Sequence, residues 1–115
     1  MPVVVRRSSP WDQKHAMAII RVYSDSAGTG YVNVTSLFRV GSVNLGIQCQ
    51  SRGASVTPSF TMEDSGVVEK DPTAAGIPWF AGSAVAASAI ATFPYAATYM
   101  RVVFAGAGEF TIGAV

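Results

Sequence analysis

The alternation of apolar and polar residues is most regular over residues 43–62, where it predicts two adjacent β-strands. Apolar side chains occupy every second position of the run 43–50, and the same order resumes in the run 55–62. Successive side chains of a strand point to opposite faces, so each run would have one dry face and one wet face. The connecting residues 51–54 are few, mostly polar and include a glycine, as a tight turn requires. We therefore interpret residues 43–62 as one antiparallel β-hairpin.

The two faces of this hairpin are expected to play different roles. The apolar face should build the core of the domain. The opposite face is polar but uncharged, which suits a wet protein–protein contact better than an active site. The predicted core residues are Val43, Leu45, Ile47, Val56, Phe60 and Met62. The predicted polar face consists of Asn44, Gln48, Gln50, Ser55, Thr57, Ser59 and Thr61.

Shorter alternating runs predict strands elsewhere in the chain. Residues 15–23 favour a strand, with a short helix as the competing interpretation, and residues 31–40 favour another strand. Residues 99–115 predict a second hairpin, which is closed by the glycine-rich connection 105–108.

The segment between the two hairpins is less regular. Residues 67–68 are expected to form at most a short strand, and the prolines and glycine of residues 69–78 predict a loop. Residues 83–93 are rich in alanine, which favours a helix, but their period also fits a strand. Because their neighbours are predicted to be β-structure, we expect a strand or an extended loop.

Residues 1–14 predict an extended N-terminal arm. Residues 2–5 can extend, whereas the polar stretch 6–10 should interrupt any regular element. Trp11 follows among polar neighbours, and we expect it to pack either onto its own domain or onto a neighbouring molecule.

Together these elements predict an all-β protein. About seven or eight short strands at intervals of roughly ten residues are typical of a β-sandwich or a jelly roll. We expect a single-domain antiparallel β-sandwich, jelly-roll-like, over residues 15–115, preceded by the arm of residues 1–14.

The low charge of the chain points to contact with other protein. Charged residues make up 13% of the 115 residues and the formal net charge is +1, whereas an average soluble domain has about 25% charged residues. A free monomer with so little charge is poorly protected against self-association, so we expect a homo-oligomer or a larger assembly. The basic residues are dispersed, which argues against a nucleic-acid partner. No signal-peptide core and no bilayer-spanning run is present, so we expect synthesis in the cytoplasm and no membrane partner.

The residue types that usually carry catalysis or bind metals are scarce. The single cysteine, Cys49, lies on the predicted apolar face and is expected to pack as a small hydrophobe. The single histidine, His15, follows Asp12 closely, but no nucleophile is placed to complete a triad. The acidic pairs at 63–64 and 69–71 fit neither a calcium loop nor a glycosidase pattern. We therefore expect no catalytic, metal-binding or cofactor-binding residues, and a protein that is not an enzyme.

Residues 43–115 contain an alternating hairpin (SVNLGIQCQSRGASVTPSFTMED), an aromatic after a loop (IPWF) and a closing Tyr-x-Arg strand with a glycine-rich reversal (YMRVVFAGAGEFTIGAV). In these motifs the segment resembles the small β-sandwich virion proteins of tailed bacteriophages. The resemblance implies a capsid decoration (cement) protein or a tail-associated component, located in the virion and made in the host cytoplasm. By family analogy the chain would form a homo-oligomer, with a trimer favoured, and would bind capsid or tail proteins of the same particle.

The resemblance does not extend to residues 1–42, and a role of the N-terminal arm in assembly is a hypothesis added to it. The residues expected to contact a neighbouring subunit are Val3, Val4, Val5, Arg6, Arg7 and Trp11. The alternative function is a carbohydrate-binding module on a tail, in which Trp79, Phe80 and Tyr95 would offer a stacking platform. The competing interpretation of Trp79 and Phe80 is that they cap the core.

Overall fold

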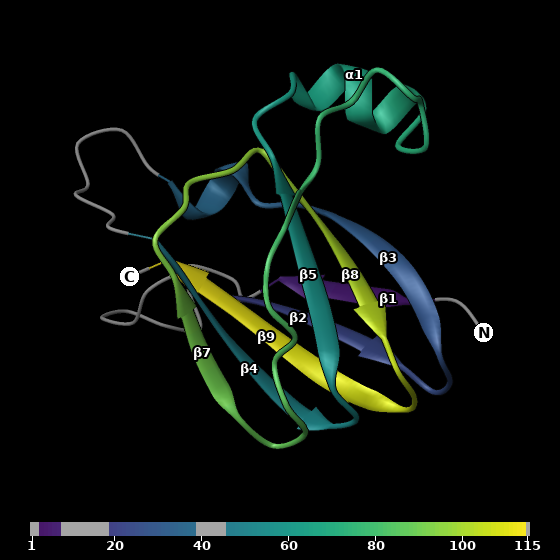
Figure 1. The fold of residues 1–115 in the computed structure, drawn as a ribbon, viewed down its shortest axis with the longest axis vertical. Coiled ribbons are helices and arrows are strands. Elements are labelled where there is room, and N and C mark those ends of the chain that lie inside the picture. Colours follow the sequence, from purple (N-terminus) through teal and green to yellow (C-terminus); the bar gives the residue numbers. More distant parts are fainter. Residues whose placement is uncertain (1–2, 8–18, 39–45, 115) are drawn as a thin grey trace.

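The computed structural model describes residues 3–7, 19–38 and 46–114 of the chain, and every structural statement below concerns these residues. They form nine β-strands, one short α-helix and a single 3-10 turn (Figure 1). The strands are β1 (Val4–Arg7), β2 (Ile19–Ser24), β3 (Gly28–Asn33), β4 (Ile47–Gly53), β5 (Val56–Thr61), β6 (Phe80–Ala81), β7 (Ile90–Phe93), β8 (Tyr99–Phe104) and β9 (Gly108–Ala114). The helix α1 spans Ser65–Lys70, and the 3-10 turn η1 spans Thr35–Leu37. Within these ranges no helix combines the length and hydrophobicity that crossing a membrane requires.

The strands form two antiparallel sheets that pack face to face. The five-stranded sheet has the order β1-β2-β9-β4-β7, and the four-stranded sheet has the order β3-β8-β5-β6. Apolar side chains from both sheets, among them Met100, Phe104 and Phe110, are buried in one core between them. In Figure 1 the two sheets overlie each other, and α1 stands at one end of the sandwich. The prediction of an all-β antiparallel sandwich is confirmed.

The short connections between consecutive strands cross from one sheet to the other. β4 pairs with β7 and β9, whereas β5 pairs with β6 and β8. The consecutive strands β8 and β9 likewise belong to different sheets, and so do β2 and β3. The predicted hairpins over residues 43–62 and 99–115 are therefore wrong, because their strands face each other across the core instead of pairing edge to edge. Both arrangements bury every second side chain, so they produce the same alternation along the sequence.

Two of these crossing connections touch each other, and glycines make the contact possible. The β4–β5 and β8–β9 connections meet where Gly53 pairs with Gly108, and the Ala54 N–H donates to the Ala107 carbonyl at 3.1 Å. Gly53 has a φ of +95°, which glycine adopts without strain. A Cβ on Gly108 would lie 2.6 Å from a backbone carbonyl oxygen of β4. Side chains at this crossing would push the two connections apart.

Three of the six predicted core residues of the segment 43–62 are confirmed. Ile47, Val56 and Phe60 are buried between the sheets. Met62 is 68% exposed, contrary to the prediction. The reason is that β5 ends at Thr61, so the alternation of faces does not continue to the next residue. The predicted positions that lie outside the described residues are Val43, Asn44 and Leu45.

The predicted polar face is only partly exposed. Gln48 and Gln50 face solvent as expected, but Ser59 and Thr61 are buried. Ser59 is covered because the guanidinium of Arg101 reaches over it and donates to its hydroxyl at 3.3 Å. The remaining members of that face are half-buried, namely Ser55 and Thr57.

Local structure departs from the prediction at two places. β3 starts earlier than the strand predicted over residues 31–40, and it gives way to η1 before that segment ends. Residues 67–70 lie in α1, so residues 67–68 do not form a strand, and the loop predicted over residues 69–78 starts only after Lys70. Asp64 caps this helix by accepting from the Gly66 N–H at 2.8 Å, and Val68 is fully buried beneath it. Capping and tertiary burial thus outweigh the strand preference of two adjacent valines.

Two ambiguous segments are extended, as favoured. Residues 83–93 end in β7, and before it Val85 forms an isolated bridge with Val56. Of residues 15–23, the described part from Ile19 onward belongs to β2. Residues 15–18 lie outside the described part of the chain.

Part of the predicted N-terminal arm belongs to the sandwich. β1 is an edge strand in which each residue is paired with β2. The expectation that Arg6 and Arg7 interrupt regular structure is wrong, since both lie in β1. Residues 8–14, including Trp11, lie outside the described residues. A contact of the arm with a neighbouring subunit stays a prediction.

Candidate interaction surface

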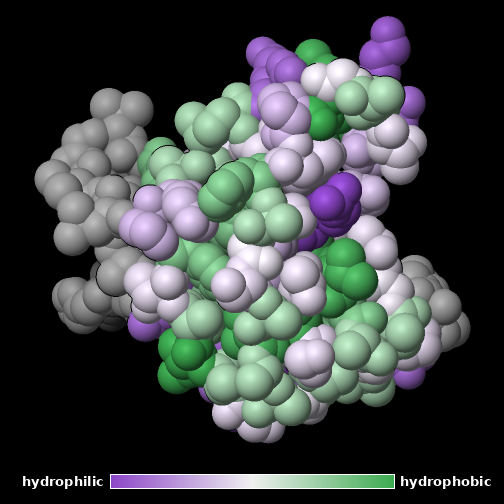
Figure 2. Space-filling model, viewed as in Figure 1, coloured by the Kyte–Doolittle hydropathy of each residue, from purple (hydrophilic) through white to green (hydrophobic). Residues whose placement is uncertain are grey.

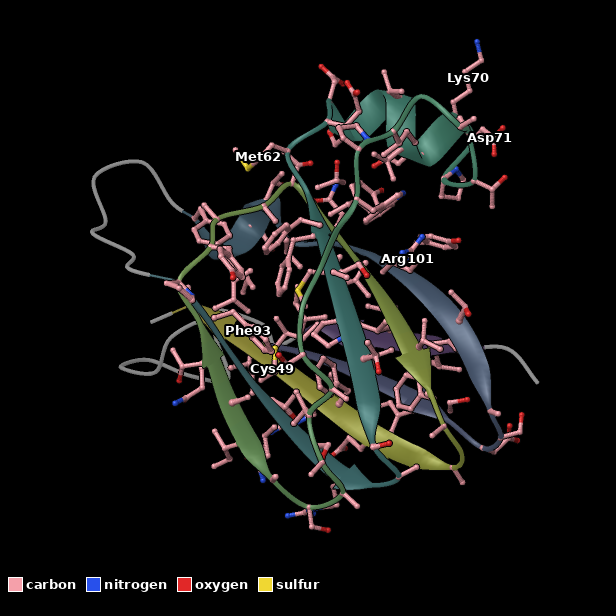
Figure 3. All side chains as sticks on the ribbon, viewed as in Figure 1. Cys49, Met62, Lys70, Asp71, Phe93 and Arg101 are labelled. Atoms are coloured by element: carbon pink, nitrogen blue, oxygen red, sulfur yellow. The ribbon has the colours of Figure 1, made fainter. Side chains whose placement is uncertain are left out.

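An apolar groove opens at the end of the sandwich, where β5 and β6 meet the chain that leaves β7. It has a volume of about 340 Å³. Met62 is 68% exposed and Phe80 is 55% exposed, so two large apolar side chains of this groove face solvent. Figure 3 shows Met62 projecting from the end of β5, away from the core. The residues that line the groove are Phe60, Thr61, Met62, Pro78, Phe80, Tyr95 and Ala96, and we call this set the apolar groove.

Packed aromatic rings support the apolar groove from below. The ring of Tyr95 stands edge-on to the ring of Phe80, with centroids 4.9 Å apart and 80° between the planes. Phe60 lies 5.4 Å from Tyr95 and 5.3 Å from Phe93, measured between ring centroids. Tilted and edge-to-face pairs at such distances are favourable beyond the area they bury. The shape of the groove is therefore set by the protein itself before any partner binds.

An acidic segment, residues 63–71, begins directly after Met62. It contains four carboxylates and one ammonium group, so its formal charge is −3. The charged residues are Glu63, Asp64, Glu69, Asp71 and Lys70. Figure 2 shows the strongest hydrophilic colour around α1 and at one area over β8, while most of the remaining face is white or green. The apolar groove is thus bordered by negative charge on the side of α1.

Side-chain contacts hold α1 and the acidic segment on the four-stranded sheet. Glu69 Oε1 accepts from the Tyr99 hydroxyl at 2.8 Å and from the Asn33 amide at 3.3 Å. Beneath the helix, Val68 and Ile77 are buried with Tyr99 in a second, smaller core. The acidic segment therefore has a defined position relative to the groove, because both adjoin the end of β5.

Trp79 lies apart from the apolar groove. Its ring packs at 5.9 Å from that of Tyr31, and the Arg101 guanidinium carbon lies 5.1 Å from its centroid. Arg101 is on the outside of β8, below α1 (Figure 3). The adjacent Phe80, the first residue of β6, instead contacts Tyr95. These three predicted aromatics do not form one stacking platform: Trp79 joins the smaller core, and Phe80 stays exposed at the groove.

Cys49 is buried in the core and lies outside the groove. It is 0% exposed on β4, between β7 and β9. Burial without a charged partner raises the pKa of its thiol to about 12, because the thiolate would lose its hydration. This environment is that of a packing cysteine, as the sequence predicts.

We expect Cys49 to resist thiol reagents as long as the protein is folded. With a pKa of about 12, only about 10⁻⁴ of the thiol is ionised at pH 8, and the thiolate is the reacting species. Ellman's reagent at pH 8 should therefore release its chromophore only after denaturant is added. Reaction of the native protein at the rate of the unfolded chain would contradict the burial of Cys49.

The predicted partner-binding residues are described only in part. Val4 is 44% exposed and Val5 is 37% exposed on β1. Val5 also lines a second groove of about 590 Å³, which includes Tyr31 of β3 and Glu69 of α1. Val3 packs against the main core, and the backbones of Arg6 and Arg7 belong to β1. Trp11, the remaining predicted partner-binding residue, lies outside the described residues. So do Asp12 and His15, the pair considered above for a catalytic triad.

The fold and the surface define a class: an all-β sandwich with a preformed, apolar and partly aromatic groove beside an acidic segment. Among residues 3–7, 19–38 and 46–114, no three His, Cys, Asp or Glu side chains are grouped so that they could hold a metal ion. Comparison with protein-family models, with curated proteins and with solved structures finds no match to this chain.

Proposed function

We propose that this chain is a non-enzymatic structural protein of a virus particle. In this proposal it is a capsid decoration (cement) protein of a tailed bacteriophage, which oligomerises and stabilises the particle through protein–protein contacts. A tail-associated position in the same kind of particle is the alternative. The observation that carries the proposal is the apolar groove. Among the described residues its lining is a shaped apolar surface suited to binding, and it lacks the paired acids, bases and nucleophiles that catalysis uses.

The order of the strands supports a role in a particle. Without the edge strand β1, the two sheets read β2-β9-β4-β7 and β3-β8-β5-β6. We infer from this order a jelly roll, an eight-stranded double sheet built from two Greek keys. Viral capsid domains and lectin domains share that architecture. The capsid use is favoured here because the predicted sugar-stacking aromatics are separated: Trp79, just before β6, packs against Tyr31, whereas Phe80 of β6 packs against Tyr95.

The surface supports binding to protein. The binding energy of protein interfaces is concentrated in a few large side chains seated in pockets, and charged residues are depleted at interface centres. Met62 and Phe80 are exposed side chains of this kind beside an existing hollow. The low charge of the whole chain, 13% of residues, agrees with a protein whose surface is largely covered in its assembly.

Immunogold labelling of purified particles tests the proposal. We expect an antibody against this chain to label the capsid surface of particles from cells that produce it. A Phe80→Ser variant should be lost from particles, whereas Ile90→Ser should be retained, because Ile90 is 62% exposed but lies outside the apolar groove. Label confined to the tail would favour the alternative. Absence of the chain from particles would overturn the proposal.

A further inference from the structure

The apolar groove has room for one or two further side chains. Its volume of about 340 Å³ is at the lower end of the range of roughly 300–1,000 Å³ that ligand pockets occupy. Met62 and Phe80 are more than half exposed while Phe60 is buried at the groove's inner end. A single aromatic side chain from a partner would cover both exposed residues and rest on a preformed floor.

The negative charge beside the groove indicates which charge the partner carries. The acidic segment, with a formal charge of −3, starts at Glu63, the residue after Met62 of the groove. Charge complementarity accelerates association with partners of opposite sign and disfavours those of like sign. The occupant that fits best is therefore an aromatic side chain flanked by basic residues.

The chain itself contains one segment with this composition, residues 6–14. A single tryptophan, Trp11, stands there among three basic residues and one acidic residue, so the formal charge of the segment is +2. Tryptophan and arginine are among the residues most enriched at the energetic centres of interfaces. We call residues 6–14 the basic segment.

The order of the strands indicates that the basic segment in the groove comes from a second copy and not from the same chain. β1, which ends at Arg7, and β7 are opposite edges of the five-stranded sheet. Four strand spacings of about 4.8 Å separate these edges, or roughly 19 Å. Between Arg7 and Trp11 the chain can extend by at most about 14 Å. The groove lies at the β7 edge and beyond it, toward β6 of the other sheet.

We propose that the apolar groove of one copy binds the basic segment of a second copy, with the indole of Trp11 seated between Met62 and Phe80. This inference rests on the proposed function, since it names a partner of the surface described there. Each copy gives one segment and receives one, so the contact closes either as a reciprocal pair of copies or, when the rotation between copies permits, as a larger ring. A three-membered ring would match the trimer expected by analogy.

The solution mass of matched full-length variants tests this contact. Sedimentation velocity over a range of concentrations should show an oligomer for the wild-type protein and for the control Ile90→Ser. Trp11→Ala, Phe80→Ser and Met62→Ser should each weaken the association by about tenfold or more. Met62 is 68% exposed, so its substitution leaves the core intact, and thermal melts identify any variant that has unfolded. Association should also weaken several-fold from 0.1 M to 1 M salt, as the Debye length falls from about 10 Å to 3 Å.

Mixing two of these variants gives a sharper test. Trp11→Ala keeps an intact groove, and Phe80→Ser keeps an intact basic segment. At a concentration at which each variant alone is monomeric, an equimolar mixture should form pairs joined by one complete contact. The chain has 2 tryptophans, so with Trp79→Phe added to both variants Trp11 is the only one left in the mixture. Its fluorescence should shift to shorter wavelength when the pair forms.

Three results would overturn the inference. They are a wild-type protein that is monomeric at every concentration, Trp11 and groove variants that keep the wild-type mass, and a mixture that remains monomeric. A monomeric wild-type protein would contradict the oligomerisation stated in the proposed function but not its place in the particle, because a monomer that labels capsids would still be a decoration protein. Conversely, absence from particles would contradict the proposed function without affecting the measured association of copies.

Discussion

Replacing Gly46 with alanine should lower the melting temperature by about 15 °C, the equivalent of about 3 kcal/mol for a domain of this size. A Cβ at Gly46 would lie 2.2 Å from the carbonyl oxygen of Phe93 and 3.1 Å from the Cα of Pro94. Both are backbone atoms, so no change of rotamer relieves the contact. The strands must instead separate where Ile47 pairs with Phe93, at the start of β4. Thermal unfolding followed by circular dichroism measures the effect.

Gly76 provides the matched control for this substitution. A Cβ added there would meet nothing within 4 Å, so Gly76→Ala should change the free energy of unfolding by no more than about 0.5 kcal/mol. Equal melting temperatures for the two variants would contradict the close approach of the chain before β4 to the end of β7.

Phe110→Ala is expected to have the largest effect on stability, a loss of about 3–5 kcal/mol. Phe110 of β9 is 0% exposed and meets Phe104 of β8 edge-on, with ring centroids 6.5 Å apart. The two strands belong to opposite sheets, so the ring pair spans the core and its loss leaves a cavity between the sheets. Denaturant unfolding with a common m-value would give the difference directly.

Val103→Ala separates this core effect from a general effect of truncation. Val103 precedes Phe104 on β8 but points outward and is 40% exposed. Its truncation should cost less than about 1 kcal/mol. A loss as large as that of Phe110→Ala would mean that the assigned inner and outer faces of β8 are reversed.

The inner face of the sandwich could be predicted because alternation reports burial directly. Ile47, Val56 and Phe60 were identified from period-two spacing alone, and all three are buried. The prediction failed at Met62 because alternation carries no signal for the end of a strand. It failed at Ser59 because the covering group, the Arg101 guanidinium, comes from a distant part of the chain.

The pairing of strands could not be predicted from the same pattern. A hairpin and a connection between sheets can both use a short glycine-containing turn, and both bury alternate side chains. Gly53 ends β4 with a positive φ, and β5 then belongs to the opposite sheet. Local composition therefore predicted where the chain turns but not the sheet to which it turns.

The apolar groove is assembled from three separate stretches, which explains why the sequence did not predict it. Met62 follows β5, Phe80 lies on β6 and Tyr95 follows β7. One local signal was available in Trp79 and Phe80. Adjacent residues of a strand point to opposite faces, so two neighbouring aromatics cannot both enter the same core. That Phe80 would meet Tyr95 required the tertiary structure.

The copy number of this chain in purified particles tests the central claim most directly. Mass spectrometry with isotope-labelled reference peptides can measure it relative to the protein that forms the capsid shell. A decoration protein that stabilises the lattice should be present in numbers comparable with the shell subunits. Absence of the chain from particles, or a copy number far below that of the shell, would contradict the claim that this groove-bearing sandwich decorates the capsid.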